Sequence, residues 1–512
     1  MDITQNIQSN WAELKSNLIN SKKYWILYLL LIVFYCLIRF QFKNYEHPKF
    51  ELVSVFIISL IGVLSISYYK SDNKSLYKTA FVVILLFGMI FSVITPICII
   101  PDEVEHFARA DITSTGELIP QYENSSFQVS QSVQDLISVG VKHATCGADM
   151  MDHKNSSILK TDADTKPIND TRVPYHSAFA QNPFFGYLPQ AVGILIAKLL
   201  DLNAIWLLWL GRIFNVLVYA GLAAFAIRKT PILKVPMFVM ACIPSVIYIG
   251  ASMSIDSLIN GMGLVVIAYF FSMYKSPKES LNERNLIIFS ILVMIMGLCK
   301  VTCFALIFLL IFLPRDRFEG KNYYYGFICV IILAAIALLW SKFYANPGFF
   351  QSYRTMQWSI FDVNSTRQMD YMLSHKKDAI IEILRMPNHF EDDLAFSWLP
   401  LTPVYLMFLG AVGILYPHEK INLKSKLGAL IVFLIIYIGT YIVLLLTWTP
   451  VGQLDDIIGV QSRYFFCLYS LIPFIFGFNH MSGDKLDLDN YIIVIALAFV
   501  AFTMINIIAK LY

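Results

Sequence analysis

The sequence predicts an all-α membrane protein that crosses the bilayer many times. Of the 512 residues, 57% are hydrophobic and 15% are charged, whereas soluble proteins carry about 25% charged residues. The hydrophobic residues gather in long runs, many of which approach the roughly 20 residues that a helix needs to span a bilayer. A formal net charge of +3 is too small to indicate a nucleic-acid partner, so the partner predicted from composition is the lipid bilayer.

Two large external loops divide the predicted spans into three groups. In order, the regions are a cytoplasmic amphipathic segment (1–23), three spans (24–100), the first loop (101–201), six spans (202–345), the second loop (346–398) and four spans (399–512). This makes about 13 spans. Their expected positions are Tyr24–Phe40, Leu52–Tyr69, Thr79–Ile100, Ala204–Ile227, Val235–Ala251, Ser257–Tyr274, Leu286–Cys299, Val301–Leu313, Tyr323–Tyr344, Leu399–Tyr416, Lys426–Trp448, Tyr464–Phe478 and Tyr491–Ile508.

The distribution of lysines predicts which side of the membrane the first loops face. Residues 70–78 contain three lysines, as does the segment before the first span, whereas 41–49 contain two. Because cytoplasmic loops are enriched in Lys and Arg, the N-terminus and 70–78 are expected inside. The stretch after Ile100 and the C-terminus are then expected on the outer face of the cell membrane.

An apolar stretch interrupted by proline and glycine, Asn182–Leu200, decides the rest of this topology. The interruptions are Pro183, Gly186, Pro189 and Gly193. If the stretch spanned the bilayer, it would place three cations outside, namely Arg228, Lys229 and Lys234. A helix lying on the outer surface leaves these cations inside, as the enrichment requires. We therefore expect a juxtamembrane helix here.

The stretch Pro101–Asp111 is the strongest candidate for a functional site. It follows the apolar run Thr79–Ile100 and brings together Asp102, Glu103, Glu105, His106 and Arg109. Asp102 is placed to cap a helix and Glu105 follows at the capping-box spacing, so a helix with this box is expected. A helix needs only one cap, so the cluster favours a function, although capping and catalysis are equally supported for Asp102 alone. A carboxylate at mid-membrane depth would cost roughly 2.5–3.5 kcal/mol, which predicts a watery cavity.

Other polar residues are expected to converge on the outer side. Lys300 interrupts an apolar run and Arg463 enters a span directly, so both are candidates to hold an anionic group. The alternative for Arg463 is snorkelling from the span end, and the alternative for Asp256 is capping of the following helix. His106 is expected to be a hydrogen-bond partner rather than a ligand, because no His or Cys set has zinc spacing. The remaining candidates are Tyr464, Asp455 and Asp456.

Both loops are expected to contain some ordered structure. The centre of the first, about 125–171, has no clean periodicity and is interpreted as a partly ordered loop over the site. The second contains a predicted amphipathic helix, Gln368–Met386, which is followed by Glu391, Asp392 and Asp393.

Three sequence blocks resemble those of one family. The run Pro101-Asp-Glu-Val-Glu-His-Phe-Ala-Arg-Ala110 resembles the Pro-Asp-Glu-x-x-His-x-x-Arg-Ala signature of the DUF2142 family of predicted membrane proteins. Ser254-Ile-Asp-Ser257 and Gly459-Val-Gln-Ser-Arg-Tyr-Phe465 resemble two further blocks in the same order, with Ser462 where the family usually has glycine. The resemblance covers about 79–478, so the two spans before it look like an N-terminal addition.

This family is similar to the GT-C superfamily of integral membrane glycosyltransferases. The resemblance implies a GT-C-like fold and sugar transfer from a polyprenyl-phosphate donor to a cell-envelope glycan or other acceptor outside. It makes Asp102 the general base. Glu103 or Glu105 would orient either Asp102 or a bound divalent metal. Arg463 with Tyr464, and Lys300, would hold the departing lipid phosphate. Attack opposite that phosphate would invert the anomeric centre.

Three other classes of function stay open. A flippase or transporter would place acids and cations along a path between spans, so their clustering at one external helix favours the enzyme. A polysaccharide polymerase or ligase would use similar loops with an oligosaccharide–pyrophosphate donor. A noncatalytic scaffold is the third, because resemblance in fold does not establish function.

Overall fold

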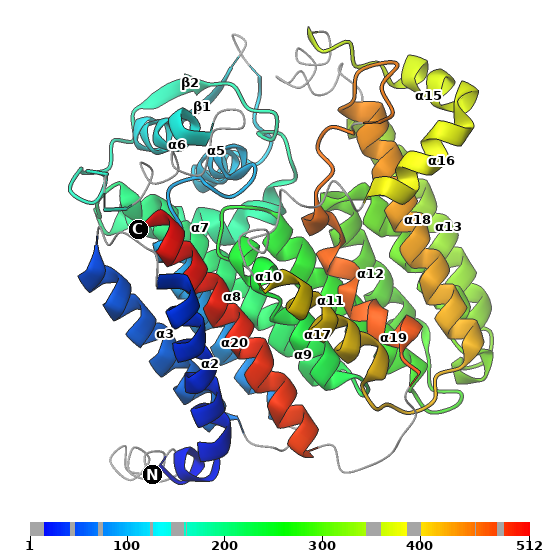
Figure 1. Ribbon diagram of the computed structural model, residues 1–512. Coiled ribbons are helices and arrows are strands. Elements are labelled where there is room, and N and C mark those ends of the chain that lie inside the picture. Colours follow the sequence, from blue (N-terminus) through cyan, green and yellow to red (C-terminus); the bar gives the residue numbers. More distant parts are fainter. Residues whose placement is uncertain are drawn as a thin grey trace.

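The computed structural model is a bundle of helices with a small module at one end (Figure 1). It describes residues 15–40, 47–69, 75–122, 126–144, 158–159, 161–344, 360–386, 401–455, 457–478 and 486–512. Within these ranges the structure is helical apart from one two-stranded sheet, isolated bridges and connections. The prediction of an all-α polytopic membrane protein is confirmed.

Eight helices in the described ranges are long and apolar enough to cross a membrane. They are α2 (Lys22–Phe40), α3 (Pro48–Tyr68), α4 (Leu76–Ile94), α8 (Ile205–Lys229), α11 (Asp256–Tyr274), α13 (Asn322–Tyr344), α18 (Leu423–Thr447) and α20 (Leu486–Leu511). The other predicted spans coincide with shorter elements: α9 (Lys234–Ala241) with α10 (Pro244–Gly250), α12 (Glu283–Cys299), the 3₁₀ helix η3 (Val301–Phe312), α17 (Thr402–Leu415), and η6 (Ser462–Leu471) with α19 (Ile472–Phe476). The total of about 13 spans stays a prediction.

The stretch Asn182–Leu200 forms a short 3₁₀ turn, η2 (Phe184–Tyr187), and the helix α7 (Leu188–Leu199). With 12 residues, α7 alone is about 18 Å long, which is shorter than a hydrocarbon core of about 30 Å. Gly193 allows α7 to lie directly on α8, because a Cβ at this position would be 2.3 Å from the Leu210 carbonyl oxygen. The stretch is therefore a short helix preceded by a 3₁₀ turn, and its position on the outer surface stays a prediction.

The module combines α5 (Glu103–Ser114), α6 (Gln131–Ala144), β1 (Phe127–Ser130) and β2 (Arg172–Tyr175). The two strands are antiparallel, and Phe127 pairs with Tyr175. The expectation that the centre of the first loop lacks periodicity was wrong for 131–144. Val133, Leu136 and Ile137 are buried at helical spacing there, so the sequence carried a helical pattern that we missed.

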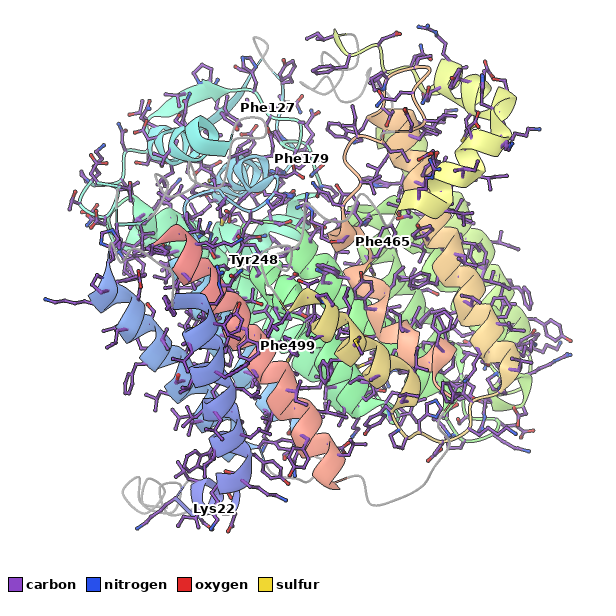
Figure 2. The ribbon with its side chains drawn as sticks, in the orientation of Figure 1. Lys22, Phe127, Phe179, Tyr248, Phe465 and Phe499 are labelled. Atoms are coloured by element: carbon purple, nitrogen blue, oxygen red, sulfur yellow. The ribbon has the colours of Figure 1, made fainter. Side chains whose placement is uncertain are left out.

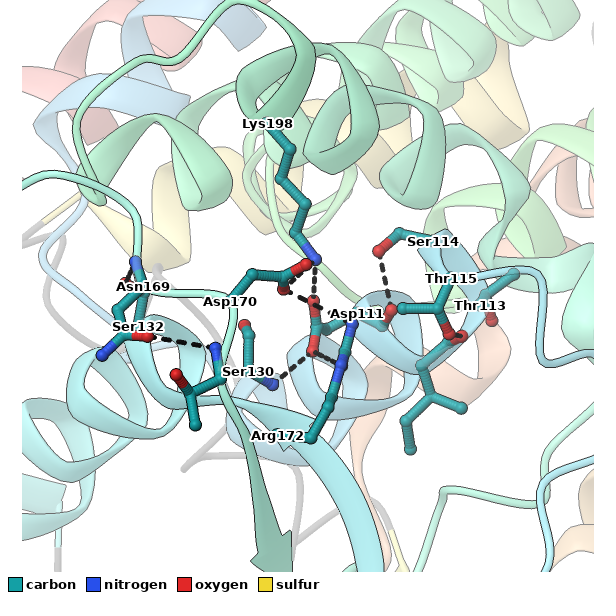
Figure 3. A network of polar contacts seen from close by, with 12 residues as sticks. Asp111, Thr113, Ser114, Thr115, Ser130, Ser132, Asn169, Asp170, Arg172 and Lys198 are labelled. Carbon is teal, nitrogen blue, oxygen red and sulfur yellow. Dashed lines mark hydrogen bonds and ion pairs between the residues drawn. The ribbon is translucent and has the colours of Figure 1, made fainter.

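A buried carboxylate, that of Asp111, joins the module to α7 (Figure 3). It accepts hydrogen bonds from the Ser130 amide (2.8 Å), Arg172 Nη1 (2.8 Å) and Lys198 Nζ (2.9 Å). These donors come from β1, β2 and α7, so one side chain of α5 fixes three neighbouring elements. Asp111 therefore has a structural role in holding α5 above the bundle.

The second loop contains two helices where one was predicted. They are α15 (Ser365–Ser374) and α16 (Lys376–Arg385), which meet at His375. Gln368 is buried, donates to the Gln453 carbonyl (2.7 Å) and accepts from the Gly452 amide (2.8 Å). Figure 1 shows α15 and α16 at the same end of the bundle as the module.

The first and last long helices run side by side. Figure 2 shows Lys22, at the start of α2, at one end of the bundle, and Figure 1 shows the C-terminus at the other, near α7. Asn490 of α20 donates to the Tyr24 hydroxyl (3.0 Å), and Tyr35 stacks on Phe502. In Figure 2, Phe499 of α20 and Tyr248 of α10 lie within the bundle, whereas Phe127 and Phe179 belong to the end that carries the module.

Candidate functional site

A cavity of about 560 Å³ lies where the module meets the bundle. Its charged and larger polar lining comes from both parts and includes Asp102, His106, Asn182, Asp256, Lys300, Gln461, Arg463 and Tyr464, and hydroxyls of Thr302, Ser341, Thr440 and Thr447 lie among the apolar residues. Its apolar lining comes mainly from α12, η3, α13 and α18, and includes Leu298, Val301, Trp340, Val443, Leu444 and Trp448. The cavity therefore offers charged groups beside an apolar wall, in a volume within the range of about 300–1,000 Å³ typical of ligand sites.

Arg463 is the centre of the charged part. Its Nη2 pairs with the Asp102 carboxylate, and its Nη1 donates to the Pro101 carbonyl (2.9 Å) and lies 3.4 Å from Asp256 Oδ2. The side chain is only 2% exposed. Arg463 is thus buried between the starts of α5 and α11, and does not snorkel from a span end.

Asp102 occupies the N-cap position of α5, as predicted, but its side chain makes no capping hydrogen bond. Its φ is 59°, a left-handed conformation that aspartate and asparagine adopt more easily than most residues. The carboxylate pairs with Arg463 and is 36% exposed, with Asp102 in the cavity lining. The predicted capping box is wrong, because Glu105 binds a different segment.

Lys300 and Tyr464 are in contact beside Arg463. The backbone at Lys300 is extended between α12 and η3, and this break allows the side chain to reach η6. Lys300 Nζ donates to the Tyr464 carbonyl (3.0 Å) and lies 3.9 Å from the centre of the Tyr464 ring. The Arg463 guanidinium carbon is 5.5 Å from the same ring centre, so one aromatic ring supports both cations.

Glu103 lies away from the cavity in a fully buried ion pair. Its two carboxylate oxygens accept from Arg212 Nε (2.8 Å) and Nη2 (2.6 Å), and Oε1 also accepts from the Met253 amide (3.1 Å). Arg212 further donates to three carbonyls at the end of α4, those of Ser92, Thr95 and Pro96. Glu103 therefore ties α4, α5, α8 and the segment before α11 together and does not orient Asp102.

Glu105 anchors a loop above the cavity. Its Oε2 accepts hydrogen bonds from Ser177 Oγ (2.5 Å) and the Ala178 amide (3.0 Å). Burial raises the pKa of Glu105, and the hydrogen bonds from Ser177 and Ala178 act in the opposite direction. The anchored loop places Phe179 beside His106, with 5.0 Å between the ring centres. Glu105 also makes no contact that would orient Asp102.

His106 and Arg109 face the start of α7. His106 Nδ1 is 2.8 Å from the Tyr187 hydroxyl oxygen, and burial lowers the pKa of His106 to about 4. Arg109 donates to the carbonyls of Asn182 and Leu118 and to Thr113 Oγ1, each at 2.9 Å. His106 therefore lines the cavity as a neutral ring, whereas Arg109 is a buried structural residue.

The remaining predicted residues lie elsewhere. Asp455 is exposed and does not line the cavity. Asp456 and the three acids Glu391, Asp392 and Asp393 lie outside the described residues. Within the part of the chain that the structure describes, no group of three or more His, Cys, Asp and Glu residues could hold a metal ion.

Two features of the site were missed from the sequence. Gln461 lines the cavity, and its buried Oε1 has no hydrogen-bond partner in the described structure, although the residue lies in a block quoted above. Asn182 also lines the cavity, and it begins the proline- and glycine-rich stretch that we used only for topology. Neither residue was predicted, because the candidate residues were chosen mainly by charge and amide side chains are neutral.

The family model described as "Predicted membrane protein (DUF2142)" matches residues 85–472. The chain belongs to the DUF2142 family. The matched region contains every cavity-lining residue named above, whereas α2, α3 and α20 of this DUF2142 protein lie outside it. No curated protein and no solved structure matches the chain.

Proposed function

We propose that this DUF2142 protein is a membrane glycosyltransferase. It would move a sugar from a polyprenyl-phosphate donor to a hydroxyl of a cell-envelope glycan or another acceptor, on the outer face of the cell membrane. The observation that carries the proposal is the amphipathic cavity, in which Asp102, Asp256, Lys300 and Arg463 lie beside the apolar wall. A polyprenyl-phosphate sugar likewise has a charged phosphate next to a long apolar chain.

The two cations suit the phosphate end of such a donor. Lys300 and Arg463 share the Tyr464 ring and both line the cavity. Guanidinium and ammonium groups held in place before reaction stabilise the charge that builds on a departing phosphate. Residues such as Trp340, Val443 and Trp448 would contact the first part of the lipid chain.

Asp102 suits the role of general base. Its carboxylate is the partly exposed member of the Arg463 cluster, whereas Asp256 is 8% exposed. Asp102 would take the proton of the acceptor hydroxyl while that oxygen attacks the anomeric carbon. The bond from this carbon to the phosphate oxygen breaks, and the electron pair leaves on the lipid phosphate. Attack from the opposite face inverts the anomeric configuration.

The experiment is transfer by the purified full chain in lipid nanodiscs. Labelled polyprenyl-phosphate sugars and a polyprenyl-pyrophosphate oligosaccharide would be supplied with acceptor glycans from the native envelope. The proposal predicts that sugar from a monophosphate donor appears on the acceptor with inverted configuration. Reaction with the pyrophosphate donor alone would favour a polymerase or ligase and contradict the proposal.

The side of the membrane is tested separately by cysteine labelling in intact cells. Exposed Glu117 follows α5, and Arg228 lies in the last turn of α8. An impermeant thiol reagent should label a cysteine at 117 and leave a cysteine at 228 unlabelled. Labelling only at 228 would place the cavity on the cytoplasmic face.

A further inference from the structure

His106 is held by a chain of hydrogen bonds that runs from Asn182 through the buried Tyr187. The Asn182 side-chain nitrogen lies 3.2 Å from the Tyr187 hydroxyl oxygen, and the same oxygen lies 2.8 Å from His106 Nδ1. Tyr187 is fully buried at the end of η2 and does not line the cavity, whereas His106 does. The Nδ1 edge of the ring therefore faces the protein, and the remainder contributes to the cavity wall.

One arrangement of these bonds places the His106 proton on Nε2. An amide nitrogen can only donate, so the Tyr187 oxygen accepts from Asn182. When Nδ1 of His106 carries no proton, it can accept a hydrogen bond from the Tyr187 O–H. In a neutral imidazole the other nitrogen bears the hydrogen, so Nε2–H is the donor.

The surrounding charges are compatible with a neutral ring. Asp102, Asp256 and Arg463 act on His106 from α5, α11 and η6, with the carboxylates favouring the charged form and Arg463 opposing it. Burial outweighs them and lowers the pKa of His106 to about 4. Arg109 adds a positive charge 5.8 Å from the Tyr187 ring centre. At neutral pH the ring is therefore a fixed donor without charge.

We propose that His106, protonated on Nε2, binds a hydroxyl oxygen of the donor sugar beside Asp102 and selects sugars that carry this hydroxyl. The sugar part of this inference depends on the proposed glycosyltransferase function, whereas the tautomer does not. Phe179 lies next to the His106 ring in the cavity lining, so an apolar surface lies beside this histidine. A flat apolar surface beside a single polar group is suited to one face of a sugar ring.

Nitrogen NMR of the full chain, labelled with ¹⁵N-histidine and reconstituted in lipid, tests the tautomer directly. A His106→Gln variant identifies the signals, because glutamine removes the ring. We expect a pyridine-type signal for Nδ1 and a pyrrole-type signal for Nε2 at pH 7. Tyr187→Phe removes the hydroxyl that donates to Nδ1, so His106 should become a mixture of tautomers and its two nitrogen signals should broaden. A protonated Nδ1 at pH 7 in the unsubstituted chain would overturn the assignment.

Kinetics test the contact with the sugar. Glutamine places an N–H near the position of Nε2, so His106→Gln should retain most transfer, whereas His106→Leu should raise KM about tenfold, the effect of one hydrogen bond. The exposed His375→Gln variant serves as the control and should match the unsubstituted chain. A donor lacking the bound hydroxyl should be used equally by both His106 variants.

The outcomes separate the two proposals. If no donor is turned over by the unsubstituted chain, the glycosyltransferase proposal fails and the NMR result still decides the tautomer. If the unsubstituted chain transfers sugar and a folded His106→Leu variant does so with the same KM for every donor, only the His106 contact is wrong. Thermal melting of each variant distinguishes loss of the contact from loss of the fold.

Discussion

Arg463 pairs with Asp102, which lies 361 positions earlier in the chain, and its other terminal nitrogen lies 3.4 Å from Asp256. One guanidinium thereby connects the start of α5 to the start of α11 and forms one side of the cavity. In the proposed reaction this group would bind the donor phosphate and also hold the base. Its removal should therefore affect both binding and structure.

Substitution of Arg463 tests this double role. Arg463→Ala should abolish detectable use of a lipid-phosphate donor and lower the melting temperature, because two carboxylates lose their shared cation. Arg463→Lys should recover most of the stability but only part of the transfer. Lysine keeps the positive charge but cannot form the two parallel hydrogen bonds of a guanidinium. Donor binding and thermal melting would be measured in parallel. Full transfer by a stable Arg463→Ala variant would remove this residue from the proposed site.

The Glu103–Arg212 pair should behave as a structural element. Glu103→Gln leaves Arg212 buried without its charge partner, so we expect a loss of about 3–5 kcal/mol of unfolding free energy. The double variant Glu103→Leu, Arg212→Met should lose less than the sum of the two single variants. Glu283→Gln, in the exposed first turn of α12, is the matched control. An unchanged melting temperature for Glu103→Gln would show that the pair does not stabilise the bundle.

Two glycines provide a test of how α7 lies on α8. Gly193→Ala would place Cβ against the Leu210 carbonyl, and overpacking of this kind costs about 1–3 kcal/mol. Gly221→Ala, on α8, meets nothing within 4 Å and should be neutral or stabilising by up to about 1 kcal/mol. Thermal melting of the two variants gives the comparison. Equal stability would mean that α7 does not approach α8 this closely.

The buried His106 should make stability fall in acid. Its pKa is about 4 in the folded chain, against 6.5 for an unperturbed histidine, so the unfolded state binds a proton first as pH falls. Stability should therefore decline between about pH 6.5 and pH 4, by about 3 kcal/mol for this residue alone. The raised pKa of Glu105 makes stability increase as the pH falls. This contribution is the same in the unsubstituted chain and in His106→Gln, so a comparison of the two isolates the effect of His106. His106→Gln should give the flatter melting profile, and parallel profiles would contradict the burial of a neutral ring.

Hydropathy was sufficient to predict the all-α class, and charge pointed to several residues of the cavity. The long apolar runs became helices, and Asp102, Asp256, Lys300, Arg463 and Tyr464 meet in one place. What failed was the assignment of partners within the acidic stretch. Neighbouring carboxylates at 102, 103 and 105 point to Arg463, Arg212 and Ser177, because successive helical residues face different directions. The spacing of residues on a helix predicts the direction of each side chain. It does not predict which residue of another helix will be its partner.

The helix α6 illustrates a second limit. Its apolar residues have helical spacing, but they lie within a long polar region and are few. The segment is ordered by β1, β2 and α5, which come together only in the folded module. Tertiary contacts of this kind stabilise a helix that its own sequence pattern marks only weakly.

Sugar transfer by Asp102→Asn tests the proposed glycosyltransferase mechanism. Asparagine adopts the left-handed backbone and caps a helix about as well as aspartate, and its side-chain oxygen can still accept from Arg463. It cannot take a proton. Because Asp256 still lies beside Arg463, the variant should keep its fold and lose transfer by roughly 10²–10⁴-fold, the usual contribution of a general base. Glu117→Gln, an exposed carboxylate just after α5, should keep full activity as the control. If a stable Asp102→Asn protein transferred sugar at the unsubstituted rate, Asp102 would not be the general base.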